Sequence, residues 1–277
     1  MRIDSFSYAG EQDMLECRLT ELDSVIDRWV IVEADVTHGG NQAKPYHYLD
    51  QRDRFAPWAD RIVYVQATDL PDLPDAWSRE LAQREWVWSG LRVLDAQPDD
   101  IILHGDIDEI PTAFAAKLVR PHGMVVMHQR FHPFAVDWFH PAVWEGTVAA
   151  KLSSIGRFAM MRQSRMTAPH DTKHRIPDAG WHLSWVSDSI ESKEAKIDSF
   201  CHPEIAPTWR GRLADCYETG LHVDGVPLQP VDVDESWPRW IVEGHAPAAW
   251  FRPRDVTRPR PVVHVPQLVA PNAGRVL

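Results

Sequence analysis

Apolar positions in the first half of the chain follow helical and strand-like patterns in turn. Leucines at 4-3-4 spacing predict a helix over residues 11–27, and residues 77–94 suit a second helix. Short continuous apolar runs predict buried strands at residues 29–32, 61–65, 99–104 and 124–127. This alternation of helices and strands predicts an α/β domain with a mostly parallel central sheet.

The pattern is less regular beyond residue 130. An aromatic-rich segment is followed by an expected strand over 181–186, in which Trp181 and Trp185 would share a face, and by a helix over 189–200. No repeat or linker divides the chain, so we expect one domain over 1–245. The remaining residues, 246–277, are rich in proline and predict a tail that wraps the surface or frays.

Three carboxylates follow directly on the apolar run at 101–103. Asp106 and Asp108 alternate with an isoleucine, so an extended backbone points both side chains to one face. Carboxylates packed this closely repel one another unless a cation neutralises them, and two hard oxygen ligands suit Mn²⁺ or Mg²⁺. Because ligands bind at the carboxyl ends of strands in open α/β sheets, a cation-dependent site is expected here. The alternative is that these acids cap a helix at 112–118.

Charge and cysteine content exclude several classes of protein. The net charge of −11 disfavours extended nonspecific binding to nucleic acid and binding to anionic membranes. Cys17, Cys201 and Cys216 are odd in number and match neither a disulfide framework nor a metal motif, which favours a reducing compartment. The N-terminus has no apolar signal segment and no run of residues is long enough to span a membrane. We therefore expect a cytoplasmic protein.

Tryptophan is unusually abundant, with 13 residues in the chain. Its large flat apolar face can stack on sugar rings or bases, although filling of the core explains most of these residues. Trp138 and Trp144, in the segment rich in Phe, Pro and His, are the candidates for stacking on an acceptor. Trp181 and Trp185 fit the core better.

Several separate segments, in order, resemble glycosyltransferase family 17, the family of the bisecting N-acetylglucosaminyltransferase of N-glycan cores. The resemblance extends over about residues 3–225. The matching segments are residues 15–22, 30–34, 37–38, 44–45, 79–80, 83–84, 105–111 and 179–185.

The resemblance implies a GT-A-like fold, a nucleotide-sugar donor, a divalent metal and transfer with inversion at the anomeric carbon. A UDP-sugar is the expected donor, with N-acetylglucosamine as the candidate sugar, and a glycan or another hydroxyl-bearing molecule is the acceptor. Because the sequence lacks the membrane anchor of the animal members, a bacterial or viral enzyme fits better than a Golgi one.

The same resemblance assigns candidate roles around the donor. Asp106 and Asp108 would hold the metal against the donor diphosphate, with His182 as third ligand and His202 as a second candidate. The alternative for His182 is a core histidine. Residues expected to bind the nucleotide or its diphosphate are Glu33, Lys44, Arg79, Arg84 and Asp106. For Arg79 and Glu80 the alternative is a solvated pair on a helix surface.

Inversion also needs a general base that deprotonates the acceptor hydroxyl. Carboxylates available for this role are Glu109, Asp137, Glu145, Asp178 and Glu204. Glu109 is the preferred candidate because it belongs to the acidic cluster, and a role in positioning its neighbours is equally compatible with that place.

Other functions remain as alternatives. A carbohydrate-binding module without catalysis would use the tryptophans alone, but sugar binding needs no repulsive acidic cluster. A metal-dependent phosphoesterase or nuclease would need more acidic and histidine ligands. A transferase acting on a modified nucleobase or a virion protein differs from the leading hypothesis only in its acceptor.

Overall fold

The computed structural model describes residues 1–70, 73–120, 123–167, 174–187, 189–199, 209 and 211–252. Four parallel strands form the first half of its sheet, in the order β3-β2-β1-β4. Their bounds are β1 Arg2–Tyr8, β2 Arg28–Ala34, β3 Ile62–Ala67 and β4 Ile101–Asp106. This half confirms the expected α/β domain with a parallel sheet.

Alternating side chains of these strands point to two separate cores. In β2, Trp29 and Ile31 pack on one face, whereas Val30 and Val32 pack on the other. Both faces are buried, which explains why the strand reads as a continuous apolar run in the sequence. A parallel sheet needs such cover on both sides.

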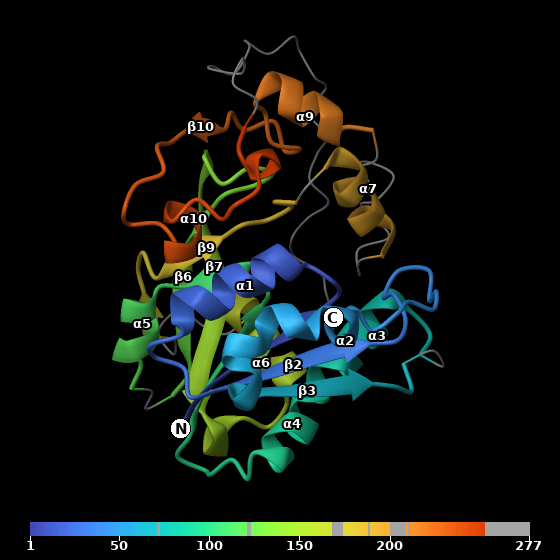
Figure 1. Cartoon of the computed structure of the whole chain (residues 1–277), viewed down its shortest axis with the longest axis vertical. Coiled ribbons are helices and arrows are strands. Elements are labelled where there is room, and N and C mark those ends of the chain that lie inside the picture. The colour runs from blue at the N-terminus through green and yellow to red at the C-terminus, as the bar shows by residue number, and fades with distance from the viewer. Residues whose placement is uncertain are drawn as a thin grey trace.

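Helices supply that cover in two layers (Figure 1). One layer consists of α1 Gln12–Leu22, α2 His47–Gln51, the 3₁₀ helix η1 Arg52–Arg61, α5 Ala113–Leu118 and α10 Arg239–Val242. The other layer consists of α3 Ala76–Glu85, α4 Val87–Val93 and α6 Phe158–Thr167. The central strands are therefore shielded from solvent except at their ends.

The second half of the sheet mixes strand directions. β7 pairs antiparallel with both β4 and β6, β9 runs parallel to β6, and β5 closes the edge antiparallel to β9. The bounds are β5 Glu109–Pro111, β6 Val125–Phe131, β7 Trp138–Lys151, η2 Leu152–Ser154, β8 His174–Ile176, β9 Gly180–His182 and β10 Gln229–Pro230. Because β5 follows β4 after two residues, the acidic motif bridges the two halves.

A third, smaller core lies beyond β6 and β9, where the orange segments of Figure 1 gather. It includes Phe134, Trp138, Trp185 and Tyr217 and is covered by α7 Ile190–Ser199 and α9 Leu213–Thr219. The chain then returns to the main core, where Trp250 of η4 Ala248–Trp250 is buried. Packed structure thus extends past residue 246, the expected start of the tail. Residues 253–277 lie outside the described part.

Two elements differ from their predictions. The helix expected over 77–94 is two helices, because the chain turns at Trp86, whose amide bonds to Gln83 three residues back. The strand expected over 181–186 ends at His182. Trp185 has a left-handed backbone (φ 62°), so it does not continue the face of Trp181, although both side chains are buried.

No helix in the described ranges combines the length and the apolar character needed to cross a membrane.

Candidate functional site

A cleft of about 580 Å³ opens where β1 and β2 end. Residues 8–14 form one side of it, and residues 36–38 with Lys44 and His47 form another. Gly10 is required at the turn, because its φ is +109° and a Cβ there would lie 3.0 Å from the His47 ring. The remaining side comes from residues 185–187 and from Lys196 of α7. The cleft is therefore at the carboxyl edge of the parallel strands, where α/β sheets bind ligands.

The acidic motif lies at the same edge, in the turn from β4 to β5. Asp106 is the last residue of β4 and Glu109 the first of β5. The turn is held from outside by several contacts. Leu183 donates its amide to the Asp108 carbonyl at 2.8 Å, and Arg18 donates to the carbonyls of Asp106 at 2.8 Å and Glu109 at 2.7 Å. The three carboxylates thus point into different surroundings from one rigid turn.

Asp106 is held by arginines from two helices. Arg84 of α3 donates to Oδ1 at 2.6 Å, and Arg162 of α6 bonds to Oδ2. Burial alone would raise the pKa of Asp106, but the guanidinium groups of Arg162 and Arg84 hold it well below its usual range. Asp106 is therefore an ionised carboxylate with both oxygens occupied by charged donors.

Glu109 is surrounded more completely still. Its Oε1 accepts hydrogen bonds from Arg162 at 2.6 Å, from Arg165 at 2.8 Å and from the Trp144 indole at 2.6 Å. Its Oε2 accepts the amide of Asp106 at 3.0 Å, and the side chain has no exposed surface. This environment is suited to orienting arginines and the β4–β5 turn, since the carboxylate is fully buried among protein donors.

Asp108 has a different environment. Its Oδ2 lies 3.3 Å from the ammonium of Lys196, and its Oδ1 lies 3.7 Å from Nε2 of His182. Burial lowers the pKa of His182 despite the opposing charge of Asp108, so the imidazole is neutral at pH 7. A separation of 3.7 Å is too long for a hydrogen bond. Of the three carboxylates, Asp108 is the one linked by Lys196 to the cleft.

His182 is held in place by aromatic rings. It stacks on Trp144 with ring centroids 4.1 Å apart and on Phe131 at 5.2 Å. The β5–β9 register places His182 opposite Glu109. Trp144 thus packs on His182 and donates to Glu109, whereas Trp138, the other tryptophan predicted to stack on an acceptor, is buried in the third core.

Glu33 and Lys44 form a pair at the side of the cleft, with Lys44 Nζ 3.1 Å from Glu33 Oε1. Glu33 also accepts the amides of His47 and Tyr48 and the hydroxyl of Tyr64, and it has no exposed surface. All of these donors come from the protein, so Glu33 is placed to fix the 44–48 segment rather than to contact a ribose. Lys44 itself lines the cleft.

Arg79 and Arg84 are both buried in the interior face of α3. Arg79 donates to the carbonyls of His38 and Leu73, each at 2.8 Å, and so holds two loops at the rim. Glu80 is bonded to Arg84 at 2.6 Å and is also buried. The alternative of a solvated surface pair for Arg79 and Glu80 is therefore wrong, since neither side chain is exposed.

The other carboxylates considered as bases are distributed over the molecule. Asp137 bonds to Arg252 at 3.0 Å, Glu145 to Arg175 at 2.7 Å, and the exposed Asp178 lies 3.0 Å from Arg130. Glu204, His202 and Cys201 lie outside the described residues, while Cys17 and Cys216 are buried free thiols.

Three residues of the site have no signal in the sequence. Arg162, Arg165 and Lys196 follow the acidic motif by more than 50 residues and belong to no recognisable motif. Only their helical spacing could have suggested a shared face for Arg162 and Arg165. Only the folded structure, in which α6 and α7 pack near the end of β4, identifies the carboxylates with which they pair.

Comparison with known proteins gives one family and distant relatives. The family model of glycosyltransferase family 17 matches residues 2–209. The β-1,4-mannosyl-glycoprotein 4-β-N-acetylglucosaminyltransferases of Homo sapiens and Rattus norvegicus are each 22% identical over 214 residues, which is 66% of this chain. The chain spans about 40% of the length of these curated relatives.

Among solved structures, one likeness is to glucosyl-3-phosphoglycerate synthase from Mycobacterium tuberculosis, in complex with Mn²⁺, uridine diphosphate and phosphoglyceric acid. The TM-score is 0.35 and the sequences are 12% identical, with 87% of this chain and 91% of that chain covered.

Proposed function

The chain belongs to glycosyltransferase family 17, and we propose that it transfers a sugar from a nucleoside diphosphate donor to an acceptor hydroxyl. The observation that supports this most directly is the connection between the cleft and the acidic motif. Lys196 lines the cleft and lies 3.3 Å from Asp108. The ammonium group of Lys196 at this junction suits the binding of a diphosphate. The nucleoside would then occupy the cleft, and the sugar would face the acidic motif. The volume of about 580 Å³ is in the usual range for such ligands.

Asp108 and His182 fit a divalent cation. Asp108 Oδ1 and His182 Nε2 lie 3.7 Å apart without a hydrogen bond, a separation that two ligands of one ion with bonds of ~2.1 Å can adopt. Both oxygens of Asp106 are occupied by arginines, so we assign Asp106 to positioning rather than to the ion. When bound, Mn²⁺ or Mg²⁺ would supply positive charge that stabilises the departing diphosphate.

The chain's own residues account for the rest of the proposed mechanism. Lys196 would stabilise negative charge on the leaving phosphate oxygens, and Lys44 would bind from the opposite rim. Glu109 would hold Arg162 and Arg165, and so keep the β4–β5 turn in one conformation. We therefore favour positioning over the base role for Glu109. Inversion at the anomeric carbon, which the family resemblance implies, would result from direct attack by the acceptor hydroxyl.

The names of the relatives suggest which donor sugar and which acceptor to test first. The human and rat proteins are N-acetylglucosaminyltransferases acting on a mannosyl glycoprotein. We propose UDP-N-acetylglucosamine as the first donor to test, with a sugar hydroxyl of a glycan as the first acceptor.

A thermal-shift screen with UDP-, GDP-, TDP- and CMP-sugars tests this proposal, since a ligand that binds only the folded state raises Tm. We expect a shift with a UDP-sugar that is larger when Mn²⁺ is present. Lys196→Ala should weaken donor binding roughly tenfold, about 1.4 kcal/mol, because it removes the cation between cleft and motif. Lys151→Ala is the matched control, since this surface lysine pairs only with the exposed Asp99 in the hydrogen bonds described.

Two outcomes would contradict the proposal. Folded protein that responds to none of the nucleotide sugars would exclude a donor site in the cleft. A shift with free glycans that needs neither nucleotide nor metal would favour the carbohydrate-binding module.

A further inference from the structure

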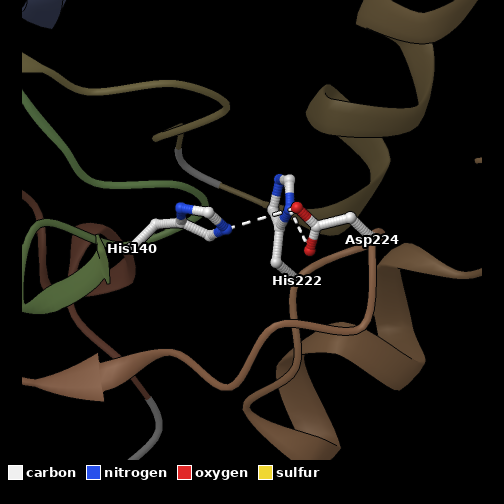
Figure 2. A group of neighbouring side chains, drawn as sticks. All are labelled: His140, His222 and Asp224. Carbon is white, nitrogen blue, oxygen red and sulfur yellow. Dashed lines mark hydrogen bonds and ion pairs between the residues drawn. The ribbon is translucent and has the colours of Figure 1, made fainter. Parts of the chain in front are cut away.

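Two histidines and a carboxylate converge at a second place, outside the acidic motif (Figure 2). His140 comes from β7, whereas His222 and Asp224 come from the turn between α9 and β10. Asp224 Oδ2 lies 3.3 Å from His140 Nε2, and Asp224 Oδ1 lies 2.9 Å from His222 Nδ1. One atom from each residue lies within 4.8 Å of the others, the single group of this kind in the described part of the chain.

The turn that carries His222 and Asp224 is shaped by its own backbone. Val226 donates its amide to Asp224 Oδ1 at 3.0 Å, His222 donates to the Val226 carbonyl at 2.9 Å, and Gly225 donates to the His222 carbonyl at 2.8 Å. These bonds fix the turn without the help of His140. The positions of the two imidazoles are therefore set by separate elements that meet at the carboxylate.

Burial prepares these side chains as ligands. His140 and His222 are 5% and 9% exposed, and Nδ1 of His222 is buried without a well-aligned hydrogen bond although it points toward Asp224. Two buried imidazoles that converge on one carboxylate are a donor set suited to a metal ion.

We propose that His140, His222 and Asp224 bind a divalent transition-metal ion of the zinc class, at a site separate from the donor cleft. Two imidazole nitrogens and one carboxylate oxygen are a common ligand set for zinc, with the fourth position left to water. The Asp224 side chain is 48% exposed, so that position faces solvent. The ion would join the 220–226 turn to β7.

The hydrogen bonds of His140 indicate which ions the site selects. Ala142 donates its amide to His140 Nδ1 at 3.1 Å, so in the ion-free form Nε2 carries the ring proton and faces Asp224. Binding forms a metal–Nε2 bond, moves that proton through solvent to Nδ1, and breaks the bond from Ala142. Mg²⁺ binds imidazole too weakly to compensate for this loss, whereas Zn²⁺ and Co²⁺ bind imidazole well.

The proposed site is close enough to the donor site to require an explicit control. Phe131 lies between them, with its ring 5.1 Å from that of His140, 5.6 Å from that of His222 and 5.2 Å from that of His182. An ion bound at Asp108 and His182 must therefore be distinguished from one bound at His140, His222 and Asp224. Asp108→Asn serves this purpose.

Titration of the chelator-treated full chain with Co²⁺, followed by visible d–d absorption, tests the proposal. In Asp108→Asn, which lacks a ligand of the donor-site ion, we expect one Co²⁺ per chain, displaced by Zn²⁺ and not by excess Mg²⁺. The signal should persist in Asp108→Asn and in His245→Ala, a control histidine that is exposed and lies outside the group. The affinity for Co²⁺ should fall by more than about 100-fold in His222→Ala, since even changes to residues outside the ligand set lower metal affinity roughly 10–100-fold.

Asp224→Asn covers the case in which His222→Ala fails to fold, because Asp224 is half-exposed and the amide is nearly isosteric. It should also weaken Co²⁺ binding while circular dichroism stays unchanged. Wild-type protein that binds neither Co²⁺ nor Zn²⁺ below millimolar concentrations would overturn the proposal. So would binding that survives His222→Ala or Asp224→Asn, or binding that is lost in Asp108→Asn. None of these readouts depends on transferase activity.

Discussion

Two parts of one short motif have opposite surroundings. Asp106 and Glu109 are paired with the guanidinium groups of Arg84, Arg162 and Arg165, whereas Asp108 faces His182 and, through Lys196, the cleft. We refer to the first set as the arginine cluster and to the second as the cleft-side group. The difference indicates that the acidic motif is not one site. We propose that the arginine cluster stabilises the turn and that the cleft-side group takes part in the chemistry.

The largest effect is expected from a substitution in the arginine cluster that lowers the free energy of unfolding. Glu109→Gln removes the charge that Arg162 and Arg165 share, and it leaves both guanidinium groups buried with less compensation. Removing one partner of a buried ion pair costs about 3–5 kcal/mol. Because Arg162 keeps Asp106 as a second partner, we expect about 3 kcal/mol. Urea denaturation at pH 7 measures the change.

Glu145→Gln is the matched control for that experiment. Glu145 also pairs with an arginine, Arg175, but a quarter of its side chain is exposed, so its loss should cost at most about 1 kcal/mol. Equal losses of stability in the two variants would mean that the arginine cluster has no special structural role.

Asp108→Asn should show the opposite pattern, with a smaller loss of stability and a larger loss of activity. We expect transfer, or release of UDP from the donor, to fall by about 10²–10³-fold, because the carboxylate acts where charge develops on the leaving group. The free energy of unfolding should change by only about 1 kcal/mol. Initial rates at saturating donor, paired with denaturation curves, measure both effects. An Asp108→Asn enzyme with full activity would remove Asp108 from the mechanism.

The sequence predicts the four central elements of the sheet unequally. β2, β3 and β4 are continuous apolar runs and were predicted. β1 was not, because its residues 2–8 include Asp4 and Ser5, whose polar side chains disguise a buried strand. In the structure Asp4 is paired with Arg18 at 2.7 Å and Ser5 bonds to His104 at 3.0 Å. A strand with satisfied polar groups has no apolar pattern to detect.

The site was predictable to the extent that it is local in sequence. The acidic motif and its place after a buried strand could be found, and His182 was identified through the family resemblance. The division of the motif between arginine cluster and cleft-side group could not be found. It depends on Arg162 and Lys196, which reach the motif from helices 56 and 88 residues further along the chain. The same limit applies to His140 and Asp224, which are 84 residues apart.

The smallest predicted effect concerns pH and a buried histidine beside the arginine cluster. His104 on β4 is fully buried, with its Nε2 3.4 Å from Arg84. Burial, followed by the charges of Arg84 and Arg162, holds the pKa of His104 well below its usual value. In the unfolded chain the pKa returns to ~6.5, so the unfolded state binds a proton that the folded state does not.

The difference in His104 pKa between the folded and unfolded states fixes the direction in which stability changes with pH. His104 contributes no penalty above pH ~6.5, and stability falls as the pH decreases below that value, by up to about 1.4 kcal/mol per pH unit. Between pH 6.5 and 5 the wild type should therefore lose about 2 kcal/mol through this residue. His104→Gln should flatten the dependence by that amount. The lowered pKa of Asp106 acts only below pH ~4, outside this window. Parallel stability curves for wild type and His104→Gln would show that burial and the neighbouring arginines together do not lower the pKa of His104.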